Sequence, residues 1–505
     1  MIKKTLLLLT FATLSLFSQK SYGFGDSLGL SPYWNWKQIE TKHFRVTFPD
    51  HLEPVARKST SYLEQVHETL TSFLFWEPDY KVSVVIVDNT DLANGLASAA
   101  LRFGMVLMVT PPEPWFSTAA YEDWLKLLII HEYTHVLNMD VTDDFIKIFR
   151  MLFGDIIRPN SLWTRWMLEG MAVYTETLFT KAGRGRSAYW DMILRTAVLE
   201  DKLSQPDFVS FDMLNGHVPH APFGEVPYLF GYEMMNQIVY HTQENDLKKT
   251  YDNRDHLEQS HDVLGLMSLR SGGRIPFFIS GNVYNLTGKE WPGHWKSWTQ
   301  RTKEHAEAQL KKIKSQPLTS YKKLIDEPTS SYGAVFSADG EWLAYKQRSS
   351  DELTGLYLKN LKTQETRLVS DDALGVGLAF TSDSKHLVFS GVRNHSHYSI
   401  WSDLAYYDLE QEKIRWLSDA LRAKDPHLSP DGKKIVFSYN ENQSTGIAMA
   451  DFVFEDEKYA LKNIKKILTP RQLDRASNPK FYQNGKSIVF SHHINGKIGE
   501  DLMLI

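Results

Sequence analysis

Four copies of one short pattern constrain the fold of the last third of this chain. Each copy places an Asp or Asn in a turn just before an apolar run: Asp339, Asp383, Asp431 and Asn484. Successive turn residues are 44, 48 and 53 positions apart, a spacing typical of one four-stranded sheet per repeat. Asp-Gly and Asn-Gly supply the positive φ of a tight hairpin, so each following apolar run is expected to be a buried inner strand.

These repeats resemble the TolB-like, Pro-Asp-repeat β-propellers of secreted bacterial proteins. The copy Ser429-Pro430-Asp431-Gly432 fits that pattern best, and Ser384 replaces the glycine in the second copy. Only the first strands of the fourth copy precede Ile505. The sequence therefore predicts an incomplete β-propeller over residues 316–505, whose broad face is expected to bind a protein or peptide partner.

Residues 1–23 predict a cleaved secretory signal peptide. Lys3 and Lys4 precede an uncharged apolar run from Thr5 to Phe17, and Ser21-Tyr22-Gly23 places small residues where a signal peptidase cuts. The alternative is a membrane anchor, but this run has 13 residues, whereas a membrane-spanning helix needs about 20. We expect a periplasmic or secreted bacterial protein.

Composition excludes several classes of function. The net charge of −5 and the pI near 6.4 provide no field that would attract nucleic acid. The absence of cysteine excludes a disulfide scaffold, a thiolate metal site and a cysteine nucleophile. Any metal ion must therefore be bound by His, Asp or Glu.

The first part of the chain predicts an α+β domain over residues 24–315. Strands are expected at 44–48, 81–87 and 105–110, with a helix at 53–75 between the first two. Helical periodicity dominates residues 121–314, and a linker is expected near 316–319. A chain of 505 residues exceeds what one core usually serves, so a multidomain protein is predicted.

The apolar helical run 125–139 contains His131-Glu132-x-x-His135. One helical turn separates the two histidines, so both imidazoles project from one face and can bind one Zn²⁺. Glu132 is expected to point toward the open side of the metal and to take a proton from water. The alternative is a helix with two ordinary histidines.

Catalytic zinc takes three protein ligands, and Glu169 is the predicted third. It lies in Trp166-x-x-Glu169-Gly170-x-Ala172-x-Tyr174. The small residues Gly170 and Ala172 are expected to let this helix pack closely beside the histidine helix. Glu176, about two turns further on, is the alternative ligand.

Together these motifs resemble the gluzincin zinc metallopeptidases, relatives of thermolysin and of the aminopeptidases that share Glu-Gly-x-Ala. The resemblance implies a thermolysin-like catalytic domain with one zinc ion on His131, His135 and Glu169, and hydrolysis of peptide bonds. Two departures stand out. The gap between His135 and Glu169 is 33 residues, longer than in those enzymes, and the aminopeptidases' Gly-x-Met-Glu-Asn sequence is missing. Internal cleavage is therefore expected rather than trimming of free amino termini.

The long gap contains an apolar stretch, residues 145–157. We expect it to pack against the domain core, and the alternative is a lid or a contact with a membrane surface. The strand at 105–110 is expected to pair with the backbone of the substrate.

Tyr228 is the candidate for stabilising the oxyanion. Tyr228-Leu-Phe-Gly231 resembles the Tyr-x-x-Gly of aminopeptidase-type gluzincins, whose tyrosine hydroxyl donates to that oxygen. The alternative is an aromatic residue packed in the core. His217 and His220 are nearby in the sequence and could assist, although loop histidines are usually solvated.

The sequence thus predicts an exported zinc metallopeptidase, an α+β thermolysin-like domain followed by a partial β-propeller. The alternative from another class is a propeller-based envelope scaffold with an inactive peptidase-like domain. A zinc hydrolase acting on another kind of substrate is the third possibility.

Overall fold

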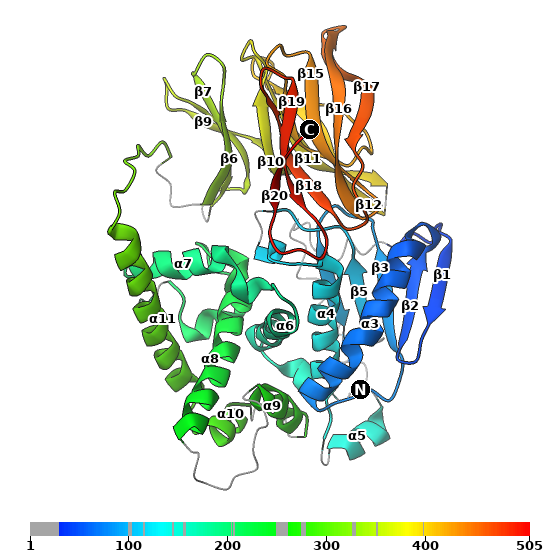
Figure 1. The fold of residues 1–505 in the computed structure, drawn as a ribbon, viewed down its shortest axis with the longest axis vertical. Helices are drawn as coiled ribbons and strands as arrows, with labels where there is room; N and C mark the ends of the chain where they lie inside the picture. Colours follow the sequence, from blue (N-terminus) through cyan, green and yellow to red (C-terminus); the bar gives the residue numbers. More distant parts are fainter. Residues whose placement is uncertain are drawn as a thin grey trace, which may run out of the picture.

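The computed structural model describes residues 30–98, 104–114, 117–143, 146–154, 158–203, 205, 208–248, 261–273, 279–325, 330–349, 352–396 and 398–505. The predicted signal peptide lies outside these residues. The first part combines one mixed sheet with the nine α-helices of the described residues, and the last part consists of mainly antiparallel sheets (Figure 1).

A five-stranded sheet opens the fold, in the order β1-β2-β3-β5-β4. Its strands are β1 (Trp36–Glu40), β2 (Phe44–Pro49), β3 (Val82–Val87), β4 (Asn94–Ser98) and β5 (Gly104–Met108). The three central strands run parallel, and β4 pairs antiparallel with β5. The expectation that residues 105–110 form the substrate-binding edge is therefore wrong, because β5 lies inside the sheet and β4 forms its edge.

The α-helices cover this sheet and extend away from it (Figure 1). They are α3 (Glu53–Leu74), α4 (Trp124–Asp140), α5 (Ile146–Phe153), α6 (Arg165–Phe179), α7 (Ala188–Leu199), α8 (Val226–Lys248), α9 (Asp262–Gly272), α10 (Ile279–Thr287) and α11 (Trp291–Lys314). Apolar residues at three- and four-residue steps give α3 one buried face, which includes Val55, Leu63 and Leu70.

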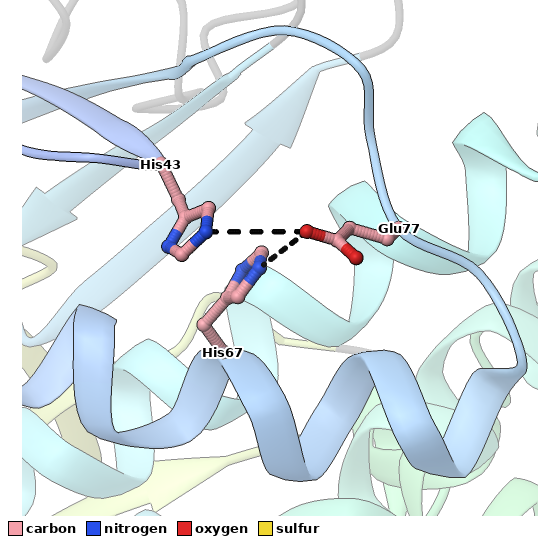
Figure 2. Close-up of side chains that lie close together, drawn as sticks. All are labelled: His43, His67 and Glu77. Atoms are coloured by element: carbon pink, nitrogen blue, oxygen red, sulfur yellow. Dashed lines mark hydrogen bonds and ion pairs between the residues drawn. The ribbon is translucent and has the colours of Figure 1, made fainter.

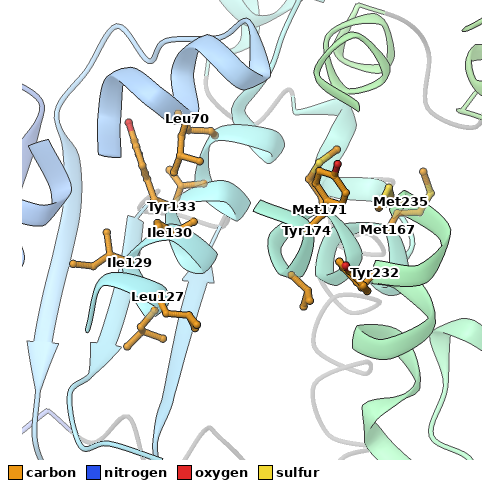
Figure 3. Close-up of a cluster of buried hydrophobic side chains, with 14 of the residues drawn as sticks. Leu70, Leu127, Ile129, Ile130, Tyr133, Met167, Met171, Tyr174, Tyr232 and Met235 are labelled. Atoms are coloured by element: carbon orange, nitrogen blue, oxygen red, sulfur yellow. The ribbon is translucent and has the colours of Figure 1, made fainter. Parts of the chain in front are cut away.

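One hydrophobic core joins the sheet to the helices. Ile129, Ile130 and Tyr133 of α4 contribute to it together with Met171 of α6 and Met235 of α8. Figure 3 shows the α4 side chains on the side of the sheet and α3, and the α6 and α8 side chains facing one another. Because α4 is buried almost all round, its polar residues are held in fixed positions.

The helix α5 departs from expectation. Of residues 146–154, Ile146 alone is buried, and Met151, Leu152 and Phe153 are exposed by 79%, 69% and 60%. The expected packing of this stretch against the core is therefore wrong for the residues that the structure describes. Arg150 ties the helix to the domain through its Nη2, 2.8 Å from Asp140 Oδ1. No helix within the described ranges is both long and apolar enough to cross a membrane.

Mainly antiparallel sheets follow α11, after residues 317–325, which have no regular secondary structure. Two sheets have four strands each: β6 (Ser330–Phe336), β7 (Trp342–Arg348), β8 (Gly355–Asn360) and β9 (Thr366–Ser370), then β10 (Ala373–Phe380), β11 (His386–Ser396), β12 (Ser399–Asp408) and β13 (Lys413–Trp416). A seven-stranded sheet completes the set: β14 (Ala423–Leu428), β15 (Lys434–Glu441), β16 (Ser444–Glu455), β17 (Lys458–Leu468), β18 (Arg475–Tyr482), β19 (Ser487–His493) and β20 (Asp501–Leu504).

Each repeated Asp or Asn lies in the turn between the first two strands of its unit. The residues that follow, Gly340, Ser384, Gly432 and Gly485, have φ of 70°, 59°, 70° and 84°. In the third copy, Ser429 Oγ donates to Asp431 Oδ1 at 2.6 Å, and Asp431 Oδ1 accepts from the backbone N–H of Lys433 at 3.1 Å. These bonds fix the turn so that the next apolar run enters the buried inner strand.

Candidate metal and active site

The helix α4 presents the two histidines of the His-Glu-x-x-His motif on one face. Its first turn is capped by Asp123, whose Oδ1 accepts from the backbone N–H of Lys126 at 3.1 Å. The rings of His131 and His135 stand nearly perpendicular, at 87°, and their Nε2 atoms are 3.2 Å apart. Perpendicular rings let the two Nε2 lone pairs converge on a single point.

Glu169 of α6 completes a triangle with the two histidines. Its Oε2 lies 3.4 Å from His131 Nε2 and 3.3 Å from His135 Nε2. Tetrahedral ligands bonded to zinc at about 2.0–2.1 Å stand about 3.3 Å from one another. The three side chains thus have the donor types and the spacing that a small divalent cation needs, and together they could hold one ion.

Glu176 lies behind His131, away from the Nε2 atoms. Its Oε2 is 2.9 Å from His131 Nδ1. The side chain is fully buried and accepts three hydrogen bonds from Arg184, from the backbone N–H at 3.0 Å and from Nε and Nη2 at 2.9 Å. A carboxylate on the second nitrogen fixes the tautomer and the orientation of a ligating histidine. Glu176 is thus placed to orient a ligand rather than to be one.

Sequence reasoning missed Arg184. It lies in a short turn, η4 (Arg184–Arg186), that follows α6, and its guanidinium is buried against Glu176. Nothing in the local sequence separates Arg184 from the neighbouring Arg186. Only the packing of the turn against α6 distinguishes them.

The charges around the triangle favour a cation. Burial and Arg184 lower the pKa of His131, but the Glu169 and Glu176 carboxylates outweigh them and raise it to about 9. Burial alone would raise the pKa of Glu169, yet the two histidines hold it well below its usual range. Glu176 likewise has its pKa lowered to about 2, because Arg184 and His131 outweigh burial. Both acids therefore carry negative charge at neutral pH.

Glu132 is buried next to the triangle and packs against the edge strand β4. A Cβ added to Gly95 of β4 would lie 2.4 Å from Glu132 Oε1, so a side chain there would displace the Glu132 carboxyl group or the strand. Burial raises the pKa of Glu132 above its usual value. A carboxyl group with a raised pKa is suited to taking up a proton and returning it.

A cavity of about 460 Å³ opens over these groups. Residues 93–97, at the start of β4 and along it, form one wall, and residues of α4 and α6, Tyr228, Thr118, Trp163 and Arg184 line the rest. Because β4 is the edge of its sheet, one side of its backbone has no strand partner among the described residues. An extended peptide could pair with that side.

Tyr228 lies at the start of α8 and lines the same cavity. Its ring centroid is 6.5 Å from that of His131 and 4.9 Å from the guanidinium carbon of Arg184. Burial, with a further contribution from Glu169, raises the pKa of Tyr228 to about 12. The hydroxyl group therefore stays protonated at neutral pH and can donate a hydrogen bond.

Two glycines bring Tyr228 and Glu169 together. A Cβ on Gly170 of α6 would lie 2.4 Å from the carbonyl carbon of Gly231 in α8. The expectation that Gly170 packs against the histidine helix is therefore wrong, because its neighbour is α8. One contact between α4 and α6 is made by Thr134 Oγ1 and Thr175 Oγ1, which are 2.7 Å apart.

His217 and His220 lie further from the triangle. His217 Nε2 is 3.3 Å from Arg165 Nη1, and Arg165 Nε is in turn 3.8 Å from Glu169 Oε1. The ring of His220 stacks on Phe208 at 5.5 Å. Neither histidine reaches the three ligand atoms.

A second group of possible ligands lies behind α4. His67 Nε2 and His43 Nε2 are 3.5 Å and 3.9 Å from Glu77 Oε1 (Figure 2). The two rings stack at 3.7 Å with only 13° between their planes. Their lone pairs run side by side instead of converging, so the group is less suited to hold one ion than His131, His135 and Glu169.

His395, Asp403 and Asp419 form a third group. His395 Nε2 lies 2.7 Å from Asp403 and Nδ1 lies 3.3 Å from Asp419. The imidazole therefore bridges two acids through opposite nitrogens, which is not the geometry of a chelate.

Comparison with known proteins adds little. No family model and no curated protein matches the chain. Among solved structures it is similar to TolB from Acinetobacter baumannii, with 16% identity, a TM-score of 0.29, and coverage of 36% of this chain and 42% of that one. A structure from a study of two prolyl endopeptidases has 12% identity and a TM-score of 0.26, covering 35% of this chain and 27% of that one.

A putative TolB from Agrobacterium tumefaciens has 14% identity and a TM-score of 0.26, with coverage of 35% of this chain and 77% of that one. The chain spans less than half the length of the first two structures. Similarity at this level assigns no activity to the chain.

Proposed function

We propose that this chain is an exported zinc metallopeptidase of the gluzincin type. In this proposal residues 24–315 form a thermolysin-like catalytic domain, and residues 316–505 form TolB-like β-propeller repeats. The observation that carries it is the meeting of His131 Nε2, His135 Nε2 and Glu169 Oε2 within 3.4 Å of one another, beside the buried Glu132.

His131, His135 and Glu169 would hold the metal, because they supply three donors at tetrahedral spacing. A bound zinc ion would polarise the scissile carbonyl group and lower the pKa of water to about 7. Glu176 would keep Nδ1 of His131 protonated and its ring oriented, since the carboxylate is locked by Arg184.

Glu132 would take the proton of the attacking water and deliver it to the leaving amine. Its burial supports this role, because the carboxyl group has a raised pKa and stands next to the ligands. The hydroxyl group of Tyr228 would donate a hydrogen bond to the developing oxyanion and would stabilise its negative charge.

The proposed substrate is a peptide or an extended segment of a protein. The edge strand β4 lines the cavity, which supports binding of an extended backbone. The β-sheets of residues 330–505 would bind a protein partner rather than perform chemistry. The exposed apolar residues of α5 also suit a contact with a membrane surface, which is secondary to this proposal.

Metal analysis and a protease assay test the proposal. Purified protein is expected to contain one zinc ion per chain and to cleave a denatured protein, and a chelator should abolish the cleavage. Glu132→Gln should keep the zinc and lose turnover. Retained cleavage in Glu132→Gln would refute the assigned base.

Zinc without any chelator-sensitive cleavage would instead favour the scaffold interpretation. A panel of esters and other non-peptide substrates, assayed with the same protein, distinguishes a hydrolase of a different class.

A further inference from the structure

The loop between β3 and β4 links the candidate active site to the β-rich part of the chain. It runs over residues 88–93 and leads directly into β4, where Gly95 packs against Glu132. Within its own domain, Thr110 Oγ1 donates to Asp88 Oδ1 and to the carbonyl oxygen of Thr90. The remaining bonds that anchor Asp88 and Asp91 come mainly from residues beyond 400.

Arg422 is the centre of this contact. Its Nη1 and Nη2 donate to the two carboxylate oxygens of Asp88 at 3.0 and 2.8 Å, and its Nε donates to Asp91 Oδ1 at 2.8 Å. The three side chains are exposed by 12%, 6% and 2%. A bidentate pair held away from water fixes both position and orientation.

Further bonds hold the same loop. Asp91 Oδ2 accepts from the backbone N–H and the hydroxyl group of Ser402, both at 2.8 Å. Asn440 Nδ2 donates to Asp91 Oδ1 at 2.8 Å. The backbone N–H of Ile400 donates to the carbonyl oxygen of Asn89 at 2.9 Å, as if the loop were an added strand.

A second contact reaches the start of the histidine helix. Asn495 Nδ2 donates to Asp123 Oδ2 at 2.7 Å, while Oδ1 of the same carboxylate caps α4. His493 Nε2 and the backbone N–H of Gly496 both lie within hydrogen-bond distance of the carbonyl oxygen of Glu122. The β-rich part thus holds the two segments that enter β4 and α4.

We propose that the β-rich part positions the active site, with Arg422 as a positioning residue that fixes the loop 88–93 and, through it, the substrate-facing strand β4. This inference rests on the proposed function, in which the cavity beside β4 binds the substrate. The consequence is that residues 330–505 are needed for an ordered substrate edge, in addition to any partner that they bind.

Hydrogen exchange of backbone amides, followed by mass spectrometry, tests this in the full chain. Arg422→Gln is expected to speed exchange over residues 93–98 by about tenfold, because the loop before them loses its anchor. Zinc content should stay at the wild-type level, since no ligand changes. Arg415→Gln is the matched control, because the hydrogen bond that Arg415 donates to Gln411 stays within the β-rich part.

Peptide cleavage provides a second readout. A loosened β4 should raise KM several-fold with a smaller change in kcat, whereas general destabilisation would lower the amount of active enzyme and leave KM unchanged. If Arg422→Gln does not fold, Asn440→Ala removes one bond to Asp91 and should give a smaller rise in exchange over the same residues.

The proposal would be overturned if amides 93–98 exchanged at the same rate in Arg422→Gln as in the Arg415→Gln control. It would also be overturned if Arg422→Gln had an unchanged KM and only a smaller amount of active enzyme. The exchange measurement needs no substrate. If the wild type has no peptidase activity, the proposed function fails, but the exchange measurement still tests whether Arg422 positions β4.

Discussion

Glu176 Oε2 lies 2.9 Å from His131 Nδ1, on the opposite side of the imidazole from the Nε2 atom that faces His135 and Glu169. A carboxylate in this position does two things. It would favour a proton on Nδ1, which leaves the Nε2 lone pair for a metal, and it holds the ring in the direction of the triangle.

Replacing Glu176 by Gln should therefore weaken metal binding. The neutral amide loses the charge that supports His131 and no longer matches the buried guanidinium of Arg184. We expect the dissociation constant for zinc to rise by about 10- to 100-fold, measured by competition with a chelating dye. Glu307→Gln, on the exposed face of α11, is the control. An unchanged dissociation constant would contradict this role.

Gly95→Ala should impair turnover without removing the metal. The added methyl group would lie 2.4 Å from Glu132 Oε1, so either the carboxyl group or β4 must move. We expect kcat/KM to fall by at least about tenfold, because small displacements of a reacting group are costly. Gly281→Ala in α10 is the control, since its Cβ would meet nothing within 4 Å. Equal kcat/KM in the two variants would show that Gly95 does not constrain Glu132.

Tyr228→Phe removes the proposed donor and keeps the ring. Removal of one oxyanion donor typically lowers kcat by about 10²- to 10³-fold. Zinc content and thermal stability should stay close to those of the wild type. Should kcat remain within a factor of two or so, Tyr228 would be a packing residue, as the alternative interpretation of the sequence holds.

The buried His294 should make the stability of the fold depend on pH. Burial lowers its pKa from 6.5 to about 3 in the folded protein. The unfolded chain therefore binds a proton as the pH falls below about 6.5, while the folded protein does not. The contribution of His294 to the free energy of unfolding is complete above that pH and declines below it. Between pH 7 and pH 5 the loss for this one group is about 2 kcal/mol.

Urea unfolding at pH 7 and pH 5 measures this difference. His294→Gln should show a smaller loss of stability between the two pH values than the wild type, by about that amount. His51→Gln, on the surface, should behave like the wild type. Parallel pH profiles in all three proteins would rule out the assignment.

The parts of the fold that sequence could predict are those set by local patterns. The periodicity of α3 and the Asp-Gly turns depend on residues close to one another in the chain, and the structure has a helix and hairpins there. The edge strand β4 was missed because every residue in it is half-buried, so it lacks the alternation of apolar and polar residues that marks a strand.

The same distinction applies to the candidate site. His131, Glu132 and His135 stand within five residues, so helical geometry alone relates them. Glu169 was placed by its resemblance to a family motif, and the roles of Glu176 and Arg184 follow only from the packing of a turn against α6. The exposure of α5 could not be foreseen, since its apolar residues look like those of a core helix.

The contact between Gly170 and Gly231 couples two groups that the sequence keeps far apart. Because the backbones of α6 and α8 touch there, the main chain limits how far the proposed metal ligand Glu169 can lie from the phenol of Tyr228. Any side chain at either glycine would act as a spacer that drives Glu169 and Tyr228 apart at once. Engineering of this cavity therefore has to treat α6 and α8 as one rigid unit. New substrate specificity would be introduced through residues 93–97 on the other wall.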